Sequence, residues 1–248
     1  METGIIDLAL VIDSTSKYSD VWTPYFGQLK KFFPKEIKKY LITDEMPFDV
    51  EIENLIPVYY DNVESYRNQF LKSLKQVKEK YMLYNSEDYI LYNSVDIDEI
   101  LALVELLEED GLYDFVKLIK GPERTTEYSS NYPNVRVIDK GNNFFAQQAS
   151  LWKTASLIDV FENSVPSNGR MEQEPQGSDV CKKIGINGLQ YHIGTEVKRG
   201  SQHWDSIIFP CIATAVTKGK WNTREYGKEL NEMFEEYGVK PETRGKNK

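Results

Sequence analysis

The sequence predicts an α/β fold in which a mixed, mostly parallel sheet is covered by helices on both faces. Residues 5–12 and 81–91 are nearly continuous apolar runs, which is typical of parallel strands buried on both faces. Other segments, beginning near Val21 and Tyr66, carry apolar residues at helical spacing with lysines on the opposite side. Strands that alternate with helices in this way favour a mostly parallel sheet with helices on both of its faces.

The first half of the chain alternates predicted strands and helices. Strands are expected at 5–12, 39–42, 55–60 and 81–91, and helices at 21–33, 66–77 and 97–109. Asp96 is a suitable cap for the last of these helices, and Asp110-Gly111 is a suitable end for it. Each strand closes on polar or acidic residues, so the loops at one edge of the sheet are predicted to be polar.

The second half is less regular. Strands are expected at 115–119, 135–138, 189–193 and 207–216; residues 144–153 lead into a helix that ends near 161, residues 171–178 cap a short helix at 179–184, and an amphipathic helix covers about 223–237. The chain has no internal repeat and no long linker, so a single domain over 1–248 is predicted. Its last residues, about 241–248, are charged and are expected to be frayed.

Composition limits the classes of function. The chain has 248 residues, 39 of them acidic and 30 basic, with a net charge of -9, which argues against a general nucleic-acid binder because phosphate contacts need a basic face. Cys181 and Cys211 are too few for a disulfide framework and are predicted to be reduced core thiols. No apolar run is long enough for a membrane span, and the N-terminus does not resemble a signal peptide, so a cytoplasmic protein is expected.

The acidic pair Glu87-Asp88 interrupts the apolar run 81–91. Ligands of open α/β sheets bind beyond the carboxyl ends of the strands, and carboxylates placed there can hold a divalent cation against a diphosphate. An acidic, solvated turn with no chemical role is the alternative, since Asp and Glu are mostly surface residues. With the surrounding pattern, the pair predicts a metal-dependent enzyme that acts on a nucleotide-linked substrate.

Four segments, taken in their order along the chain, resemble the GT-A type nucleotide-sugar glycosyltransferases, particularly the small ones of large DNA viruses, phages and bacteria. They are the loop 14–22, the strand end Glu87-Asp88-Tyr89, the stretch 147–152, and Glu174 followed by Gly177-Ser178 with the later turn 218–221. Together they span nearly the whole chain. The resemblance implies a GT-A-like domain, a nucleoside-diphosphate sugar donor and a glycan or glycoprotein acceptor.

The resemblance also implies a divalent cation, Mn²⁺ or Mg²⁺, which neutralises the diphosphate leaving group. In the family an Asp-x-Asp motif holds this cation, whereas the matching positions here are Ser86-Glu87-Asp88. Asp88 is therefore the predicted metal ligand. Glu87 is predicted to be a second ligand or an acceptor of hydrogen bonds from sugar hydroxyls.

An inverting transfer needs a base that takes the proton of the attacking hydroxyl. Glu174 matches the carboxylate that precedes Gly-Ser in similar transferases and is the predicted catalytic base, with Glu172 as the alternative. Either carboxylate could instead be a solvated loop residue.

The remaining predicted contacts are with substrate. Ser14, Thr15 and Tyr18 are expected near the nucleobase and ribose, although Ser19 or Asp20 in the same loop could be a plain helix cap and Trp22 a core residue. The other predicted substrate-binding residues are Arg124, Gln148, Lys218, Lys220 and Trp221. The turn that holds the last three could also be an ordinary surface turn. His192 and His203 are weaker candidates for a metal ligand.

Two other readings stay open. A nucleotidyltransferase would share the strand and acidic pair but normally needs a glycine-rich loop after the first strand, and residues 13–17 contain no glycine. A non-catalytic nucleotide- or glycan-binding module of the same fold is possible because the metal motif departs from the family pattern.

Overall fold

The computed structural model describes residues 7–200 and 202–247, and its centre is one mixed sheet of nine strands in the order β3-β2-β1-β4-β9-β6-β10-β8-β7. The strands are β1 (Leu8–Asp13), β2 (Lys38–Thr43), β3 (Leu55–Tyr59), β4 (Tyr81–Ser86), β6 (Phe115–Lys117), β7 (Thr125–Ser129), β8 (Tyr132–Ile138), β9 (Ser150–Lys153) and β10 (Gly188–Tyr191). From β3 to β4 all neighbours are parallel. β9 is antiparallel to both β4 and β6, and β10 is parallel to β6.

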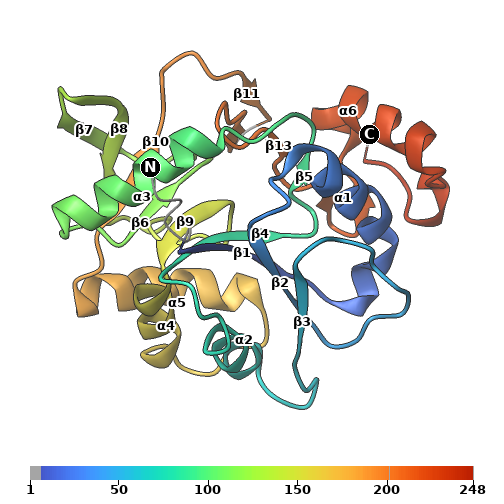
Figure 1. Ribbon diagram of the computed structural model, residues 1–248, viewed down its shortest axis with the longest axis horizontal. Helices are drawn as coiled ribbons and strands as arrows, with labels where there is room; N and C mark the ends of the chain where they lie inside the picture. The colour runs from blue at the N-terminus through green and yellow to red at the C-terminus, as the bar shows by residue number, and fades with distance from the viewer. Residues whose placement is uncertain (1–6, 201, 248) are drawn as a thin grey trace.

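Helices cover both faces of this sheet, which confirms the predicted fold class (Figure 1). Helices α1 (Ser19–Phe32), α3 (Ile97–Asp110) and α6 (Thr223–Tyr237) pack on one face, and α2 (Tyr66–Leu74), α4 (Thr154–Glu162) and α5 (Arg170–Ile184) on the other. In β1, Leu8, Leu10 and Ile12 join the first core, while Ala9 and Val11 join the second. Because alternate side chains of a strand point to opposite faces, a strand between two helical layers has to be apolar throughout.

Short elements complete the chain. They are the 3₁₀ helices η1 (Ser16–Tyr18) and η2 (Pro241–Thr243) and three small antiparallel pairs, β5 (Ile90–Leu91) with β13 (Cys211–Ile212), β11 (Lys198–Arg199) with β12 (His203–Trp204), and β14 (Val216–Thr217) with β15 (Lys220–Trp221). Among the residues that the structure describes, no helix is both long and apolar enough to cross a lipid bilayer.

Several predicted boundaries are confirmed. The Asp96 carboxylate accepts a hydrogen bond from the backbone N–H of Glu99 at 3.1 Å, as an N-cap should. Gly111 ends α3 at a φ of 69°, a conformation that costs glycine little. Helix α6 has the predicted bounds. The strand predicted at 5–12 is described from residue 8 onward, and its first two residues lie outside the described part of the chain.

The structure corrects four segments. β4 ends at Ser86, and β5 resumes outside the main sheet, paired with β13. Residues 150–153 form β9 in the middle of the sheet, although the sequence led us to expect an approach to a helix. Residues 125–129 form a strand that was missed, and the strand expected at 207–216 is reduced to short pieces at its end and middle.

Helix α5 is the correction that matters most for the site. It begins at Arg170 rather than at residue 179, so Glu174 lies on a helix and not in a loop before one. Pro175 and Gly177 disfavour a helix in isolation, but tertiary packing overrides that preference here. A Cβ atom at position 177 would lie 2.4 Å from Cδ1 of Phe145, so only glycine allows the helix to approach this ring so closely.

The charged C-terminal residues also differ from expectation. Residues 241–247 are bonded to the body of the protein, since Trp221 N–H donates to the Gly245 carbonyl at 3.0 Å and Asn247 N–H donates to the Trp221 carbonyl at 2.9 Å. The Arg244 guanidinium lies 4.6 Å from the ring centroid of Tyr18 and pairs with Asp20. Arg244, in a segment that was expected to be frayed, therefore has an aromatic ring and a carboxylate as partners.

Candidate functional site

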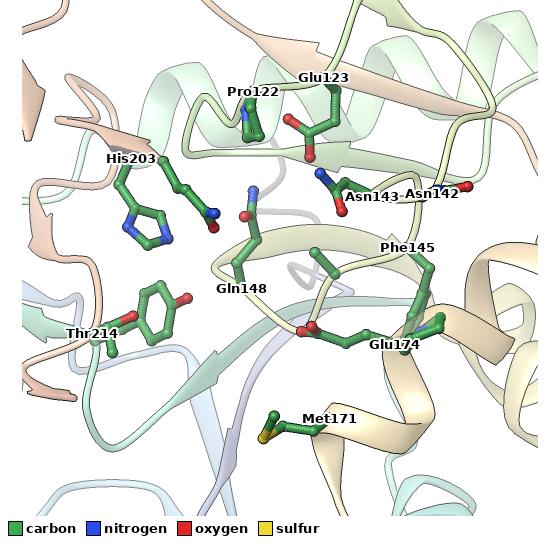
Figure 2. A pocket seen from close by; sticks show the side chains of 14 residues that line it. Pro122, Glu123, Asn142, Asn143, Phe145, Gln148, Met171, Glu174, His203 and Thr214 are labelled. Atoms are coloured by element: carbon green, nitrogen blue, oxygen red, sulfur yellow. The ribbon is translucent and has the colours of Figure 1, made fainter. Parts of the chain in front are cut away.

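Figure 2 shows a cavity of about 410 Å³. Tyr89, which directly follows the Glu87-Asp88 pair, is one of the residues that line it. The cavity is built from loops and helices far apart in sequence, as expected for a site beyond the carboxyl ends of parallel strands. Its lining includes Tyr89, Glu123, Phe145, Gln148, Glu174 and His203.

Glu174 projects from α5 into this cavity (Figure 2). Its Oε1 atom accepts a hydrogen bond from the backbone N–H of Gln147 at 2.8 Å. The same loop is tied to α5 a turn later, because Phe145 N–H donates to Ser178 Oγ at 3.0 Å and Ser178 Oγ donates to the Asn142 carbonyl at 2.9 Å. The Gly177-Ser178 pair thus holds the loop that orients the Glu174 carboxylate.

Glu172, the alternative base, has a different role. Its side chain is exposed, and its Oε2 atom accepts a hydrogen bond from the backbone N–H of Asn168 at 2.8 Å, just before α5 begins. A carboxylate bonded to backbone N–H groups at a helix N-terminus stabilises the helix. Of the two candidates, only Glu174 lines the cavity.

Glu87 and Asp88 are both buried at the end of β4. Asp88 Oδ1 accepts a hydrogen bond from Ser86 Oγ at 2.9 Å. Glu87 Oε2 is buried and has no hydrogen-bond partner in the part of the chain that the structure describes; it lies 3.9 Å from Nη2 of Arg170. The predicted acidic pair is therefore not the solvated turn of the alternative reading.

Asp13, at the end of the neighbouring strand β1, joins this cluster. Its Oδ2 atom is 2.9 Å from Nη2 of Arg170 and accepts hydrogen bonds from the hydroxyls of Tyr66 at 2.8 Å and Tyr84 at 3.2 Å. Three carboxylates and one guanidinium thus meet at the edge of the sheet between β1 and β4. Three carboxyl groups therefore lie near a single arginine at this edge.

Burial raises the pKa of Glu87 to about 8, with the Arg170 charge opposing the shift and the Asp88 and Asp13 charges adding to it. The pKa of Asp88 is raised as well, mainly by burial. Desolvation disfavours the ionised form of a carboxyl group, and like charges do the same. In the metal-free protein, burial and the neighbouring carboxylates therefore favour the protonated form of Glu87.

This pKa leads to a prediction about stability in the absence of divalent cations. Between the ordinary value of 4.5 and about 8, the folded state binds the Glu87 proton and the unfolded state releases it, so the free energy of unfolding falls as the pH rises through this window. Glutamine resembles the protonated acid. We expect Glu87→Gln to melt like the wild type near pH 5 and at a higher temperature at pH 8 to 9, measured in EDTA.

The exposed Glu109→Gln on α3 is the matched control and should show no such trend. A difference in melting temperature between Glu87→Gln and the wild type that stays constant from pH 5 to pH 9 would contradict the raised pKa.

The donor set at this edge fits a hard divalent cation. Among residues 7–200 and 202–247, no group of three or more His, Cys, Asp and Glu side chains forms a complete metal site. Mg²⁺ and similar ions, however, commonly take one or two protein carboxylates and complete their shell with water and substrate phosphates. Asp88 and the unpartnered Oε2 of Glu87 meet that requirement. His203 lines the adjoining cavity, whereas His192 pairs with Glu196 at 2.7 Å.

The loop after β1 is ordered by a residue that the sequence did not single out. Asp44, just after β2, accepts hydrogen bonds from Thr15 Oγ1 at 3.3 Å, from Ser16 N–H at 2.6 Å and from Asn62 Nδ2 at 3.0 Å. Burial works against ionisation of Asp44, but these donors outweigh it and lower its pKa to about 2. Ser14 is buried, and its Oγ accepts a hydrogen bond from the Trp22 indole at 2.8 Å.

The other predicted contact residues are scattered. Gln148 lines the cavity, and its amide donates to the Ile119 carbonyl at 2.8 Å. Trp221 is fully buried, with its ring centroid 5.0 Å from that of Phe234, so it presents no face to a sugar here. Three basic residues that were predicted to bind substrate are exposed and do not line the cavity: Arg124, Lys218 and Lys220.

Sequence reasoning missed Asp13, Arg170 and Glu123 as parts of this region, and within the stretch 147–152 it selected Gln148 but not Gln147 as a site residue. Asp13 had a usable signal, because it ends a buried strand at the edge where ligands bind. Arg170 and Glu123 had none, since each comes from a loop or helix start whose place in space depends on the complete fold.

The architecture is GT-A-like, and it is shared with several solved structures. Residues 1–349 of S. aureus TarS match with a TM-score of 0.52 over 92% of this chain and 64% of that chain, at 12% identity. The same fragment in complex with UDP-GlcNAc gives a TM-score of 0.52 over 79% of this chain and 57% of that chain, at 13% identity. A UDP-glucose pyrophosphorylase complexed with UDP-glucose gives 0.52 over 94% of this chain and all of that one, at 9% identity.

At these identities the likeness concerns the fold, and the chain spans less than two thirds of the TarS fragment, 64% of it. No protein-family profile and no curated protein sequence matches the chain.

Proposed function

We propose that the chain is a divalent-metal-dependent, inverting glycosyltransferase that moves a sugar from a nucleoside-diphosphate sugar to a hydroxyl of a glycan or glycoprotein. The observation that carries this proposal is the Glu174 carboxylate, which points into a cavity next to the buried Glu87-Asp88 pair and is oriented by the Gln147 N–H. A base and an acidic, cation-seeking strand end are the two protein groups that such a transfer needs. That solved structures of this fold hold UDP-GlcNAc and UDP-glucose supports the class of donor.

Each step has a residue. Glu174 takes the proton of the acceptor hydroxyl as its oxygen forms a bond to the anomeric carbon of the donor sugar, and the bond from that carbon to the diphosphate oxygen breaks. The nucleoside diphosphate leaves with the electron pair of that bond. Mn²⁺ or Mg²⁺ on Asp88, with Glu87 beside it, would supply Lewis-acid neutralisation of the diphosphate. Gln147 N–H holds Glu174 Oε1, which leaves Oε2 to act as the base.

The donor-binding side of the proposal uses Tyr18 and Lys220. We expect Lys220→Ala to weaken nucleoside diphosphate far more than nucleoside, because a charge-assisted phosphate contact is lost, and Tyr18→Ala to weaken both alike. Isothermal calorimetry with UDP, GDP and their nucleosides measures this, with the exposed Lys228→Ala on α6 as the control. If both variants bind as the wild type does, the nucleotide lies elsewhere.

A nucleotidyltransferase is the second candidate, and the fold similarity to a UDP-glucose pyrophosphorylase favours it. Against it stands the loop Asp13–Lys17, which lacks glycine. A panel of UDP-, GDP- and dTDP-sugars with and without Mn²⁺ separates the classes. Release of nucleoside diphosphate supports the transferase, formation of nucleoside triphosphate on addition of pyrophosphate supports the nucleotidyltransferase, and binding without turnover indicates a binding module.

A further inference from the structure

A second carboxylate lines the cavity, on the side opposite Glu174 (Figure 2). Glu123 lies between β6 and β7, and its side chain is only 5% exposed. Its Oε1 atom pairs with the Lys117 ammonium, while its Oε2 atom is buried and has no hydrogen-bond partner among residues 7–200 and 202–247. A buried polar atom without a partner is rare in folded proteins and calls for an explanation.

Lys117 and Gly121 determine the position of the Glu123 carboxylate. Lys117, at the end of β6, has a side chain that is 1% exposed, and its Nζ also donates to the Asn143 carbonyl at 2.7 Å. Burial lowers the pKa of Lys117, and the Glu123 charge opposes that shift. A Cβ atom at Gly121 would lie 2.1 Å from Glu123 Oε2, so the absence of a side chain at 121 makes room for the carboxylate.

Stability alone is a weak reason for such a pair. Taking two charges out of water costs free energy that their attraction often fails to recover, and apolar residues of similar volume are frequently as stable. Neither Lys117 nor Glu123 takes part in the transfer step proposed above. Glu123 does line the cavity, and its Oε2 atom still lacks a hydrogen-bond partner among the described residues.

The rest of the lining defines the chemistry of that group. Around Glu123 and Glu174 are uncharged amides and aromatic rings, from Asn142, Asn143, Gln148, Gln202, Tyr89 and Phe145. No lysine or arginine lines the cavity in the described part of the chain. Carboxylates and amides exchange hydrogen bonds with hydroxyls. The Glu174 carboxylate, which forms no ion pair within the described residues, repels a phosphate or a uronic acid, whereas Glu123 is already paired with Lys117. A volume of about 410 Å³ lies within the usual range of small-molecule sites.

We propose that this cavity binds the acceptor, that the acceptor is a neutral sugar rich in hydroxyls, and that Glu123 Oε2 accepts a hydrogen bond from one of those hydroxyls. Lys117 is a positioning residue that holds the Glu123 carboxylate in place. The assignment to the acceptor rests on the proposed transferase function. It follows from the place of Glu174, since the hydroxyl that loses its proton must enter the cavity that this carboxylate lines.

The test measures binding and turnover separately. The probes are methyl glycosides of neutral hexoses and N-acetylhexosamines, with a uronic acid and a sugar phosphate as anionic counterparts. Because removing Glu123 alone would strand a buried lysine, the main variant is the double substitution Lys117→Met/Glu123→Gln. Gly121→Ala displaces the carboxylate while keeping both charges, and Glu127→Gln on β7 is an exposed control. Thermal melting confirms that each variant is folded.

In ligand-observed NMR without donor, we expect saturation transfer from the wild type to neutral sugars and little to anionic ones. Both cavity variants should weaken neutral-sugar binding roughly tenfold or more, the scale for a hydrogen bond to a charged group. In turnover assays the acceptor KM should rise by the same factor, with donor KM and donor hydrolysis unchanged.

Three outcomes would overturn the proposal. They are neutral sugars that bind the folded variants as well as they bind the wild type, a wild type that prefers anionic sugars, and a rise in KM that is confined to the donor. A wild type that binds neutral sugars but releases no nucleoside diphosphate from any donor would refute the transferase function and leave the sugar site standing.

Discussion

Replacing Glu174 with glutamine is expected to lower the rate of sugar transfer by about 100-fold or more, the usual scale of general-base catalysis. Glutamine keeps an oxygen that can accept the Gln147 N–H bond, so the side chain should stay in place. Its amide nitrogen cannot take a proton. Donor affinity, measured by calorimetry, should therefore remain as in the wild type, while kcat falls.

Glu172→Gln is the matched control, because it makes the same chemical change two residues away on an exposed carboxylate that lies outside the cavity. It should retain near-normal kcat. Near-normal turnover in Glu174→Gln would remove this residue from the role of base and would favour a retaining reaction, which the anomeric configuration of the product, read by NMR, would reveal.

The second large effect concerns Asp88. We expect Asp88→Asn to abolish the gain in UDP or GDP affinity that Mn²⁺ confers on the wild type, because a neutral amide is a poor ligand for a hard cation. The fold should survive, since the asparagine oxygen can still accept the Ser86 Oγ hydrogen bond and burial favours an uncharged side chain. Calorimetric titrations of nucleotide with Mn²⁺ and with EDTA measure the difference.

Asp179→Asn, on the exposed face of α5, is the control and should respond to Mn²⁺ as the wild type does. Undiminished Mn²⁺-dependent binding in Asp88→Asn would sink the assignment of Asp88 as a ligand. Loss of that dependence in Glu87→Gln as well would make Glu87 the second ligand.

Local pattern was sufficient for most of the fold. The apolar runs of β1 and β4 and the amphipathic stripes of α1, α3 and α6 predicted the elements and the layered α/β arrangement, because burial of apolar side chains imposes a period of two or 3.6 residues on them. β9 was not predicted because the apolar pattern of so short a buried strand cannot be told apart from that of the first turn of a helix. The first part of helix α5 was not predicted because Pro175 and Gly177 have low helix propensity.

For the candidate site, the sequence by itself determined which residue types follow the strands, and so pointed to Glu87, Asp88 and Glu174. It could not determine which of these meet. Arg170 contacts both Asp13 and Glu87. It is separated from Asp13 by 157 positions along the chain. The cavity, the buried Lys117–Glu123 pair and the solvent-free core position of Trp221 likewise exist only once several loops converge. The reason is physical. Strand and helix patterns depend on residues that are close in sequence, whereas a site is formed by groups whose proximity depends on long-range packing.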